Sequence, residues 1–248
     1  MTNSKGKVAL ITGISKGIGK AIAHQLIADG FKLYGTYNTG ESEARQLKDK
    51  LKNLEIFQVD LSRRSNTLKL IENLREIEFD AIVNNAGIYQ PENFNDFDFN
   101  VWDSTFEVNL NAPLLLSIKL KDNLRDGGTI VNIASTDGFT GSFNSIAYAA
   151  SKAALISITK SLANMLGTRS KRVVGIAPGW INNTGMNTDA SFEAAQLASL
   201  GRNGTPEEIA HLVSFLISNK ASFITGTTIV ADGGYTCVDY IMKKEAGL

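Results

Sequence analysis

Short apolar runs alternate with longer segments of helical periodicity along the chain. The apolar runs carry almost no polar alternation, which is typical of strands buried on both faces of a parallel sheet. They are residues 8–11, 32–37, 56–59, 81–83, 129–133, 172–177 and 227–230. Seven such strands fit the 248 residues of the chain as one sheet.

Between these runs, apolar residues recur at the spacing of one helix face. Helices are predicted at residues 18–28, 42–51, 66–77, 101–124 and 147–166, and a last one begins after Thr205 with Pro206 in its first turn. Parallel strands need such crossover helices between them. The alternation predicts one α/β domain over residues 1–248, with a doubly wound parallel sheet and helices on both faces.

The balance of charge narrows the possible partners. Lys and Arg number 25, as do Asp and Glu, so the chain lacks the basic field that attracts nucleic acids or anionic membranes. No apolar run approaches the ~20 residues of a membrane span or the length of a secretory signal. One Cys and two His are too few for a disulfide or a zinc site. We expect a cytoplasmic protein with no structural metal, nucleic-acid partner or membrane partner.

A glycine-rich turn joins the first predicted strand to the first predicted helix. Its glycines allow close approach of the backbone to a pyrophosphate, which the free N–H groups of the helix N-terminus would face. The residues predicted to bind a dinucleotide here are Gly13, Ser15, Lys16, Gly17, Ile18 and Gly19. An ordinary strand-to-helix turn is the alternative, because a glycine string by itself is weak evidence.

The end of the second strand indicates which dinucleotide is bound. NAD enzymes usually carry an acid there for the ribose hydroxyls, but this chain has Tyr37, Asn38 and Thr39, and no carboxylate before Glu41. Lys16 in the glycine turn is a cation that can pair with a 2′-phosphate. The pattern favours NADPH over NADH; the alternative is that Lys16 is a solvated surface lysine.

Four polar residues mark a candidate catalytic site. Tyr148 and Lys152 are four residues apart in a predicted helix, so they share one face, where the ammonium favours the phenolate form of the tyrosine. Ser135 follows a strand at the carboxyl edge of the sheet, where ligands of open α/β sheets bind. Asn109 lies inside a predicted helix, an unfavourable place unless its amide is used. The ordinary alternatives are a half-buried Tyr beside a surface Lys, a Ser that caps a loop, and a surface Asn.

Together these motifs resemble the short-chain dehydrogenase/reductase family. The residues that carry the resemblance are Thr12-Gly13-x3-Gly17-x-Gly19, Asp60, Asn84-Asn85-Ala86-Gly87, Asn109, Ser135, Tyr148-x3-Lys152 and Pro178-Gly179. The resemblance implies a Rossmann-type sheet in the order 3-2-1-4-5-6-7, a nicotinamide cofactor and a homotetramer.

The resemblance also implies a role for each residue. Tyr148 would donate the proton in reduction, Lys152 would bind the nicotinamide ribose and lower the pKa of Tyr148, and Ser135 would polarise the carbonyl. Asn109 would hold a water in a proton relay. Contacts to the cofactor would come from Asp60, Leu61, Asn84, Ala86, Gly87, Pro178, Gly179, Ile181 and Thr184. The family commonly has Pro-Gly-x-Ile-x-Thr; here Thr184 is displaced by one residue, so Asn183 is an alternative contact.

Within the family, the chain looks most like bacterial 3-oxoacyl-[acyl carrier protein] reductases. Residues at about 182–205 would then form a lid over the substrate. Two basic groups could dock an acidic carrier protein: Lys119, Lys121 and Arg125, and Arg169, Lys171 and Arg172. Sugar, polyol or steroid dehydrogenases and ketoreductases of secondary metabolism resemble the chain in the same residues, whereas enoyl reductases resemble Tyr-x6-Lys. A protein that only senses NADPH is an alternative of another class.

Overall fold

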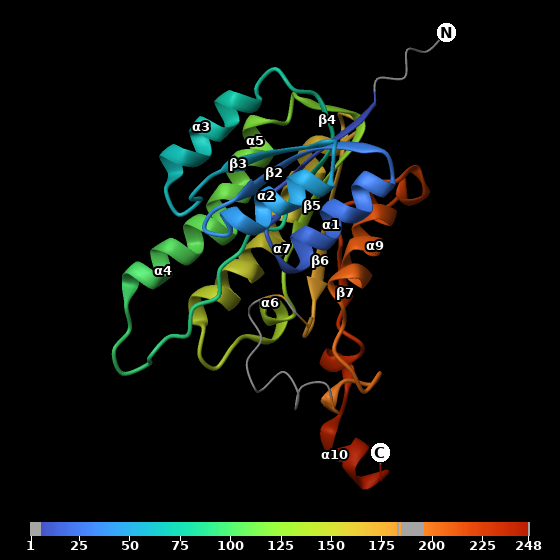
Figure 1. The fold of residues 1–248 in the computed structure, drawn as a ribbon. Helices are drawn as coiled ribbons and strands as arrows, with labels where there is room; N and C mark the ends of the chain where they lie inside the picture. The colour runs from blue at the N-terminus through green and yellow to red at the C-terminus, as the bar shows by residue number, and fades with distance from the viewer. Residues whose placement is uncertain (1–5, 183, 185–195, 248) are drawn as a thin grey trace.

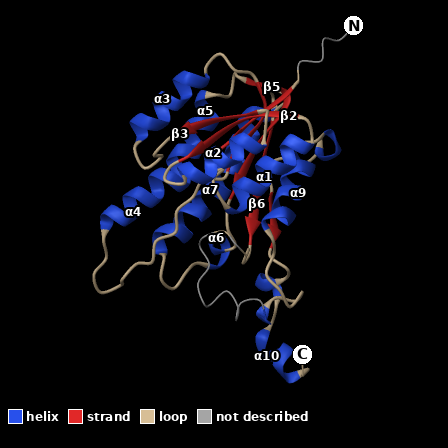
Figure 2. Cartoon of the chain, viewed as in Figure 1, coloured by secondary structure: helices blue, strands red, loops and turns tan. Residues whose placement is uncertain are grey.

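The computed structural model describes residues 6–182, 184 and 196–247. Seven strands form one sheet in the order β3-β2-β1-β4-β5-β6-β7, with every neighbouring pair parallel (Figure 2). They are β1 (Lys7–Ile11), β2 (Phe31–Tyr37), β3 (Leu54–Gln58), β4 (Phe79–Asn84), β5 (Leu124–Ile133), β6 (Arg172–Pro178) and β7 (Thr228–Ala231). The predicted fold class and strand order are confirmed.

Helices cover both faces of the sheet (Figure 1). One face carries α1 (Gly17–Ala28), α2 (Glu41–Lys50) and α9 (Pro206–Ile217). The other carries α3 (Arg64–Leu74), α5 (Ala112–Lys119) and α7 (Ile146–Gly167), with α4 (Phe99–Phe106) beside α7. Shorter elements are α6 (Asp137–Thr140), η2 (Asn219–Ala221), η3 (Tyr235–Cys237) and α10 (Tyr240–Glu245), which extends away from the sheet.

The strands are apolar at successive positions because each face of the sheet has its own core. In β1, Ala9 and Ile11 pack with α1 and α9, whereas Leu10 packs with α3, α5 and α7. Successive side chains of a strand point to opposite faces, so a sheet covered on both faces needs apolar residues at every position. The sequence pattern therefore follows directly from the two helical layers.

The prediction of one continuous helix over residues 101–124 is wrong. The chain forms α4, a π-helical turn η1 (Glu107–Asn111) and α5, and Leu124 already begins β5. Leu120 and Leu124 are both buried, which extends the apolar periodicity past the true end of the helix. The π turn is held from outside by Arg64, which donates two hydrogen bonds to Glu107 at 2.8 and 3.0 Å.

The segment predicted as a lid is described only in part. Asn183 and residues 185–195 lie outside the described residues, so the structure places Thr184 but not its alternative. Among the described residues, no helix has both the length and the apolar character that crossing a bilayer would require.

Candidate active site

The glycine turn is fastened to the end of β4, its neighbour in the sheet. Thr12 Oγ1 accepts hydrogen bonds from the backbone N–H groups of Asn85 (3.0 Å) and Ala86 (2.9 Å). The Asn85 amide donates to the carbonyls of Thr12 and Gly13. A side chain at Gly19 would overlap the Gly13 carbonyl, and Gly13 has φ +75°, so both positions require glycine. These contacts lie where the strand order reverses between β1 and β4, the usual ligand crevice of such sheets.

The start of α1 fits a phosphate group. Its N-cap residue, Lys16, makes no side-chain capping hydrogen bond, so the N–H groups of the first turn have no side-chain partner from it. The backbone after β2 lies against this turn, since a Cβ at Gly40 would come within 2.7 Å of Ser15. The predicted dinucleotide residues of the turn and of the β2 end are therefore brought together.

Charges near the end of β2 fit the predicted preference for a 2′-phosphate. Asn38 and Thr39 are exposed, and Glu41, the nearest acid after β2, forms an ion pair with Arg45 at 2.7 Å. Lys16 is exposed, and among the described residues it has no ion-pair partner. A free ammonium beside neutral side chains suits a phosphate better than two ribose hydroxyls.

Ser135, Tyr148 and Lys152 meet at the carboxyl edge of β5. The Tyr148 side chain is hydrogen-bonded to Ser135, and Lys152 Nζ lies 5.6 Å from the centroid of the Tyr148 ring. Lys152 is 3% exposed and donates to the Ile133 carbonyl at 2.7 Å. The structure thus brings the three residues together as the spacing predicts.

Burial sets the protonation states of this pair. Burial raises the pKa of Tyr148 to about 12, against the opposing effect of its hydrogen bond with Ser135. Burial also lowers the pKa of Lys152 to about 8. At neutral pH the tyrosine is therefore a protonated phenol that can donate a proton, next to an ammonium that readily loses its own. The expectation that Lys152 lowers the pKa of Tyr148 is wrong for this structure, because burial dominates that pKa.

Asn109 is fully buried in the π turn η1 and reaches the same site. Its amide accepts from the Ile88 N–H and donates to the Ile88 carbonyl and to Ser151 Oγ, which in turn donates to the Tyr148 carbonyl. A Cβ at Gly87 would lie 3.4 Å from both Asn109 Oδ1 and Lys152 Nζ. All four predicted catalytic residues therefore surround Gly87 and the end of β5.

Sequence patterns missed a polar wall beside Tyr148. The Tyr89 ring meets the Tyr148 ring edge to face at 5.5 Å, and its hydroxyl donates to Asn144 at 2.9 Å. The Glu92 carboxylate accepts from the first N–H groups of α7, at Ile146 and Ala147, and so supplies the cap that Ser145 does not. The only feature of the sequence that could have placed Tyr89 at the site is its position two residues after Gly87.

Three predicted cofactor residues turn their side chains elsewhere. Asn84 is 1% exposed, and its amide donates to Asn132 of the neighbouring strand β5 and to Ser117 of α5, so only its backbone can face a ligand. Leu61 is buried in the core beside α3. Asp60 accepts from the backbone and hydroxyl of Ser62 and thereby orders its own loop.

The end of β6 lies beside the end of β5. The Pro178 carbonyl accepts from Thr136 N–H at 3.1 Å, which sets Pro178 and Gly179 next to Ser135. Ile181 is buried and pairs with Gly204 in an isolated parallel bridge, and Thr184 is half-buried. The structure thus gathers the predicted residues of β6 at the same edge as the catalytic group.

The two basic groups lie at the amino ends of β5 and β6, at the edge of the sheet opposite the candidate catalytic residues. Lys119 and Lys121 precede β5, and Arg125 is its second residue. Arg169 and Lys171 precede β6, and Arg172 is its first residue, whereas Ser135 and Pro178 lie at the carboxyl ends of the two strands. Arg125 pairs with Asp80, and Lys121 and Arg169 both pair with Asp122. Docking of a carrier protein at these two groups stays a prediction.

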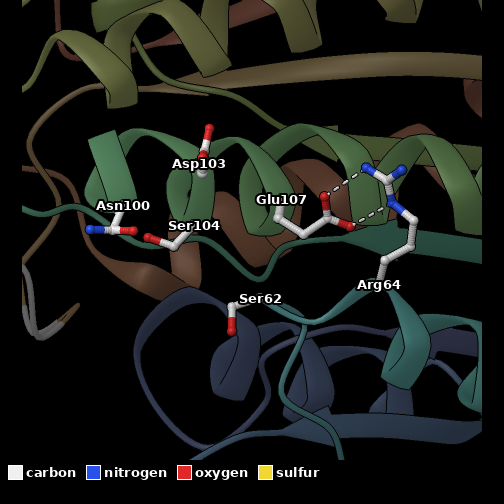
Figure 3. A pocket seen from close by; sticks show the side chains of 6 residues that line it. All are labelled: Ser62, Arg64, Asn100, Asp103, Ser104 and Glu107. Atoms are coloured by element: carbon white, nitrogen blue, oxygen red, sulfur yellow. Dashed lines mark hydrogen bonds and ion pairs between the residues drawn. The ribbon is translucent and has the colours of Figure 1, made fainter. Parts of the chain in front are cut away.

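A separate polar hollow of about 500 Å³ lies between the start of α3 and α4 (Figure 3). Its lining residues are Ser62, Arg64, Asn100, Asp103, Ser104 and Glu107. The Arg64–Glu107 ion pair closes one side, and none of the four predicted catalytic residues lines the hollow. The Arg64–Glu107 pair that holds the π turn is thus also part of this hollow.

Comparisons with known proteins agree with this geometry. The family model described as Enoyl-(Acyl carrier protein) reductase matches residues 13–236. The 3-oxoacyl-[acyl-carrier-protein] reductase FabG of Aquifex aeolicus is 36% identical, over 93% of this chain and 97% of that protein. A short-chain dehydrogenase from Burkholderia cenocepacia in complex with NADP has a TM-score of 0.89 at 30% identity, over 93% and 98% of the two chains.

A third similar structure is the angucycline C-6 ketoreductase LanV with bound NADP. It has a TM-score of 0.86 at 30% identity, over 92% of this chain and 95% of that chain. Relatives with the same fold therefore carry different substrate names. What they share, together with the matched residues and the site geometry, identifies this chain as an oxidoreductase that belongs to the short-chain dehydrogenase/reductase family.

Proposed function

We propose that this protein reduces a ketone to a secondary alcohol with NADPH, and that the ketone is a 3-oxoacyl thioester carried by acyl carrier protein. The observation that carries the chemistry is the Tyr148–Ser135 hydrogen bond beside the buried Lys152. FabG proteins similar over nearly the whole chain support the thioester, and NADP in similar structures supports the cofactor.

The residues of the chain would act on the carbonyl oxygen. Bound NADPH supplies the hydride. Ser135 Oγ and the Tyr148 hydroxyl donate hydrogen bonds to the substrate oxygen, which polarises the carbonyl and fixes its orientation. As negative charge develops on that oxygen, Tyr148 transfers its proton to it. Lys152 stabilises the resulting phenolate, and its low pKa lets it pass a proton toward Tyr148.

The glycine turn would hold the cofactor during this step. Its backbone and the α1 N-terminus would bind the pyrophosphate, and Lys16 with Asn38 and Thr39 would bind the 2′-phosphate. Asn109, tied to Ile88, keeps the Gly87 backbone and Lys152 in register, where it would hold the relay water that the family resemblance implies.

An enoyl thioester is the second candidate, because the matching family model carries that description. The four-residue spacing of Tyr148 and Lys152 and the polarising hydroxyl of Ser135 favour a carbonyl. A ketone of secondary metabolism is the third, as the LanV structure indicates.

The test is the oxidation of NADPH, and in parallel NADH, by the purified protein with acetoacetyl thioester, crotonyl thioester and a panel of ketones and sugars. Turnover of acetoacetyl thioester with NADPH is the expected result and justifies repeating it on a carrier-protein conjugate. Turnover of the crotonyl thioester alone would assign enoyl reduction. Binding of NADPH without turnover of any substrate would overturn the enzymatic proposal in favour of a sensor.

We also infer that the protein is cytoplasmic and, as the family resemblance implies, a homotetramer. Light scattering of the purified protein tests the assembly: a mass of about 27 kDa, that of one chain, would contradict it.

A further inference from the structure

Asp137 is an acidic residue near Ser135 and Tyr148, and the proposed mechanism gives it no role. It follows Ser135 by two residues, and its backbone N–H donates to Ser135 Oγ at 3.2 Å. Its charge acts on Tyr148, whose pKa it helps to raise. The Asp137 backbone therefore contacts Ser135, and the charge of its side chain acts on Tyr148, the two groups that would hold the substrate oxygen.

The Asp137 carboxylate has no counter-charge in the part of the chain that the structure describes. Among the described residues it forms no ion pair, and burial raises its pKa. It also lines a hollow of about 300 Å³ between α6 and α7, next to the candidate catalytic residues but not lined by them. The other lining residues are uncharged: Gly138, Gly141, Ser142, Ile146, Ala149, Ala150 and Ala153. Lys152, the nearest cation named in the site, is turned to the Ile133 carbonyl.

An uncompensated charge in partly buried surroundings acts strongly on a ligand. Like charges a few ångströms apart repel much more there than in water. A free 3-oxo acid carries its carboxylate one carbon away from the ketone, so binding the ketone to Ser135 and Tyr148 brings that charge close to Asp137. A thioester or ester of the same acid is neutral at this position.

We propose that Asp137 is a specificity-determining residue that rejects free 3-oxo acids and admits their neutral thioesters and esters. This inference rests on the carbonyl reduction proposed above and narrows its substrate class. The site selects an activated acyl group by repelling the unactivated acid, which needs no contact with the carrier. We expect an effect on the order of 10- to 100-fold in kcat/KM.

The experiment compares acetoacetate with methyl acetoacetate, a pair that differs mainly in charge. The readout is the ratio of the two kcat/KM values, in which any general effect of a substitution on Tyr148 cancels. In Asp137→Asn the ratio should move toward acetoacetate by 10- to 100-fold, and in Asp137→Glu it should stay near that of the wild type. Asp126→Asn is the matched control, because Asp126 is an exposed acid at the opposite end of β5.

The outcomes separate this inference from the proposed function. Equal ratios in the wild type and Asp137→Asn would overturn the role of Asp137 and leave ketone reduction intact. Should Asp137→Asn not fold, product inhibition of the wild type decides: methyl 3-hydroxybutyrate should bind at least 10-fold more tightly than 3-hydroxybutyrate, and equal binding would overturn the proposal. A wild type that reduces neither ester nor thioester would overturn the proposed function and this inference with it.

Discussion

Asn109 and Ile88 exchange two hydrogen bonds across 21 residues of sequence, at 2.8 Å from the Ile88 N–H and at 2.9 Å to its carbonyl. One side-chain amide thus satisfies both backbone groups of a residue just past Gly87. The pairing places the π turn against the strand end that faces the site, and π turns often occur at functional sites.

Removing this pairing should weaken both fold and catalysis. Asn109→Ala leaves the Ile88 N–H and carbonyl without their partner, which should lower the free energy of unfolding by about 1–3 kcal/mol for each group that stays dry. Turnover should fall as well, because Gly87 and Lys152 lose their alignment. Urea unfolding and NADPH oxidation measure the two effects. Asn100→Ala, at an exposed amide in α4, is the control and should change neither.

The phenol of Tyr148 should be needed for turnover and not for cofactor binding. Tyr148→Phe keeps the ring but removes the proton donor, so reduction should fall by roughly 10²–10⁴-fold, as expected for loss of a general acid. The dissociation constant of NADPH, measured by fluorescence, should change only a few-fold. Tyr240→Phe in α10 serves as the control. Turnover of Tyr148→Phe near that of wild type would contradict the assignment.

Lys152, which the proposed mechanism needs for turnover, should lower the free energy of unfolding at neutral pH. Its pKa of about 8 lies below the usual ~10.4, so at neutral pH the buried ammonium opposes folding. Between pH ~8 and ~10.4 the unfolded chain binds more protons, and stability from this group rises with pH. At neutral pH the penalty is at most about 3 kcal/mol, from which the bond to Ile133 recovers about 1 kcal/mol.

Lys152→Met should therefore abolish turnover and raise the unfolding free energy of the cofactor-free protein at pH 7 by about 1–2 kcal/mol. Urea midpoints at pH 7 and pH 10 measure this, and the gain should shrink at the higher pH. Lys160→Met, an exposed lysine of the same helix, should leave stability nearly unchanged. A lower unfolding free energy in Lys152→Met than in the wild type at pH 7 would contradict the prediction that the buried ammonium destabilises the fold.

Lys16 should distinguish the two nicotinamide cofactors. Lys16→Ala removes the ammonium at the glycine turn, so the dissociation constant of NADPH should rise about 10-fold while that of NADH changes little. Equal weakening of both cofactors would reject a phosphate contact. Lys20→Ala, one helical turn further along α1, controls for the change in overall charge.

The sequence by itself determined the features that depend on neighbouring residues. Apolar residues at successive positions marked the buried strands, because both faces of the sheet are covered. The glycines between β1 and α1 marked a tight turn against the backbone. Tyr148 and Lys152 share a helix face at any position in a fold, so their spacing was enough to pair them.

Only the tertiary structure decided the features that depend on residues far apart in the chain. The π turn exists because Ile88 and Arg64 hold its two sides, and periodicity alone predicted an unbroken helix. Asn84 turned inward because Asn132 of the next strand offers it a partner. Asp137 could be recognised only in the fold, where its charge acts on Tyr148 and it has no ion-pair partner among the described residues. Helical and strand periodicity indicate which residues are buried. They do not indicate which residues far away in the chain supply their hydrogen-bond partners or counter-charges.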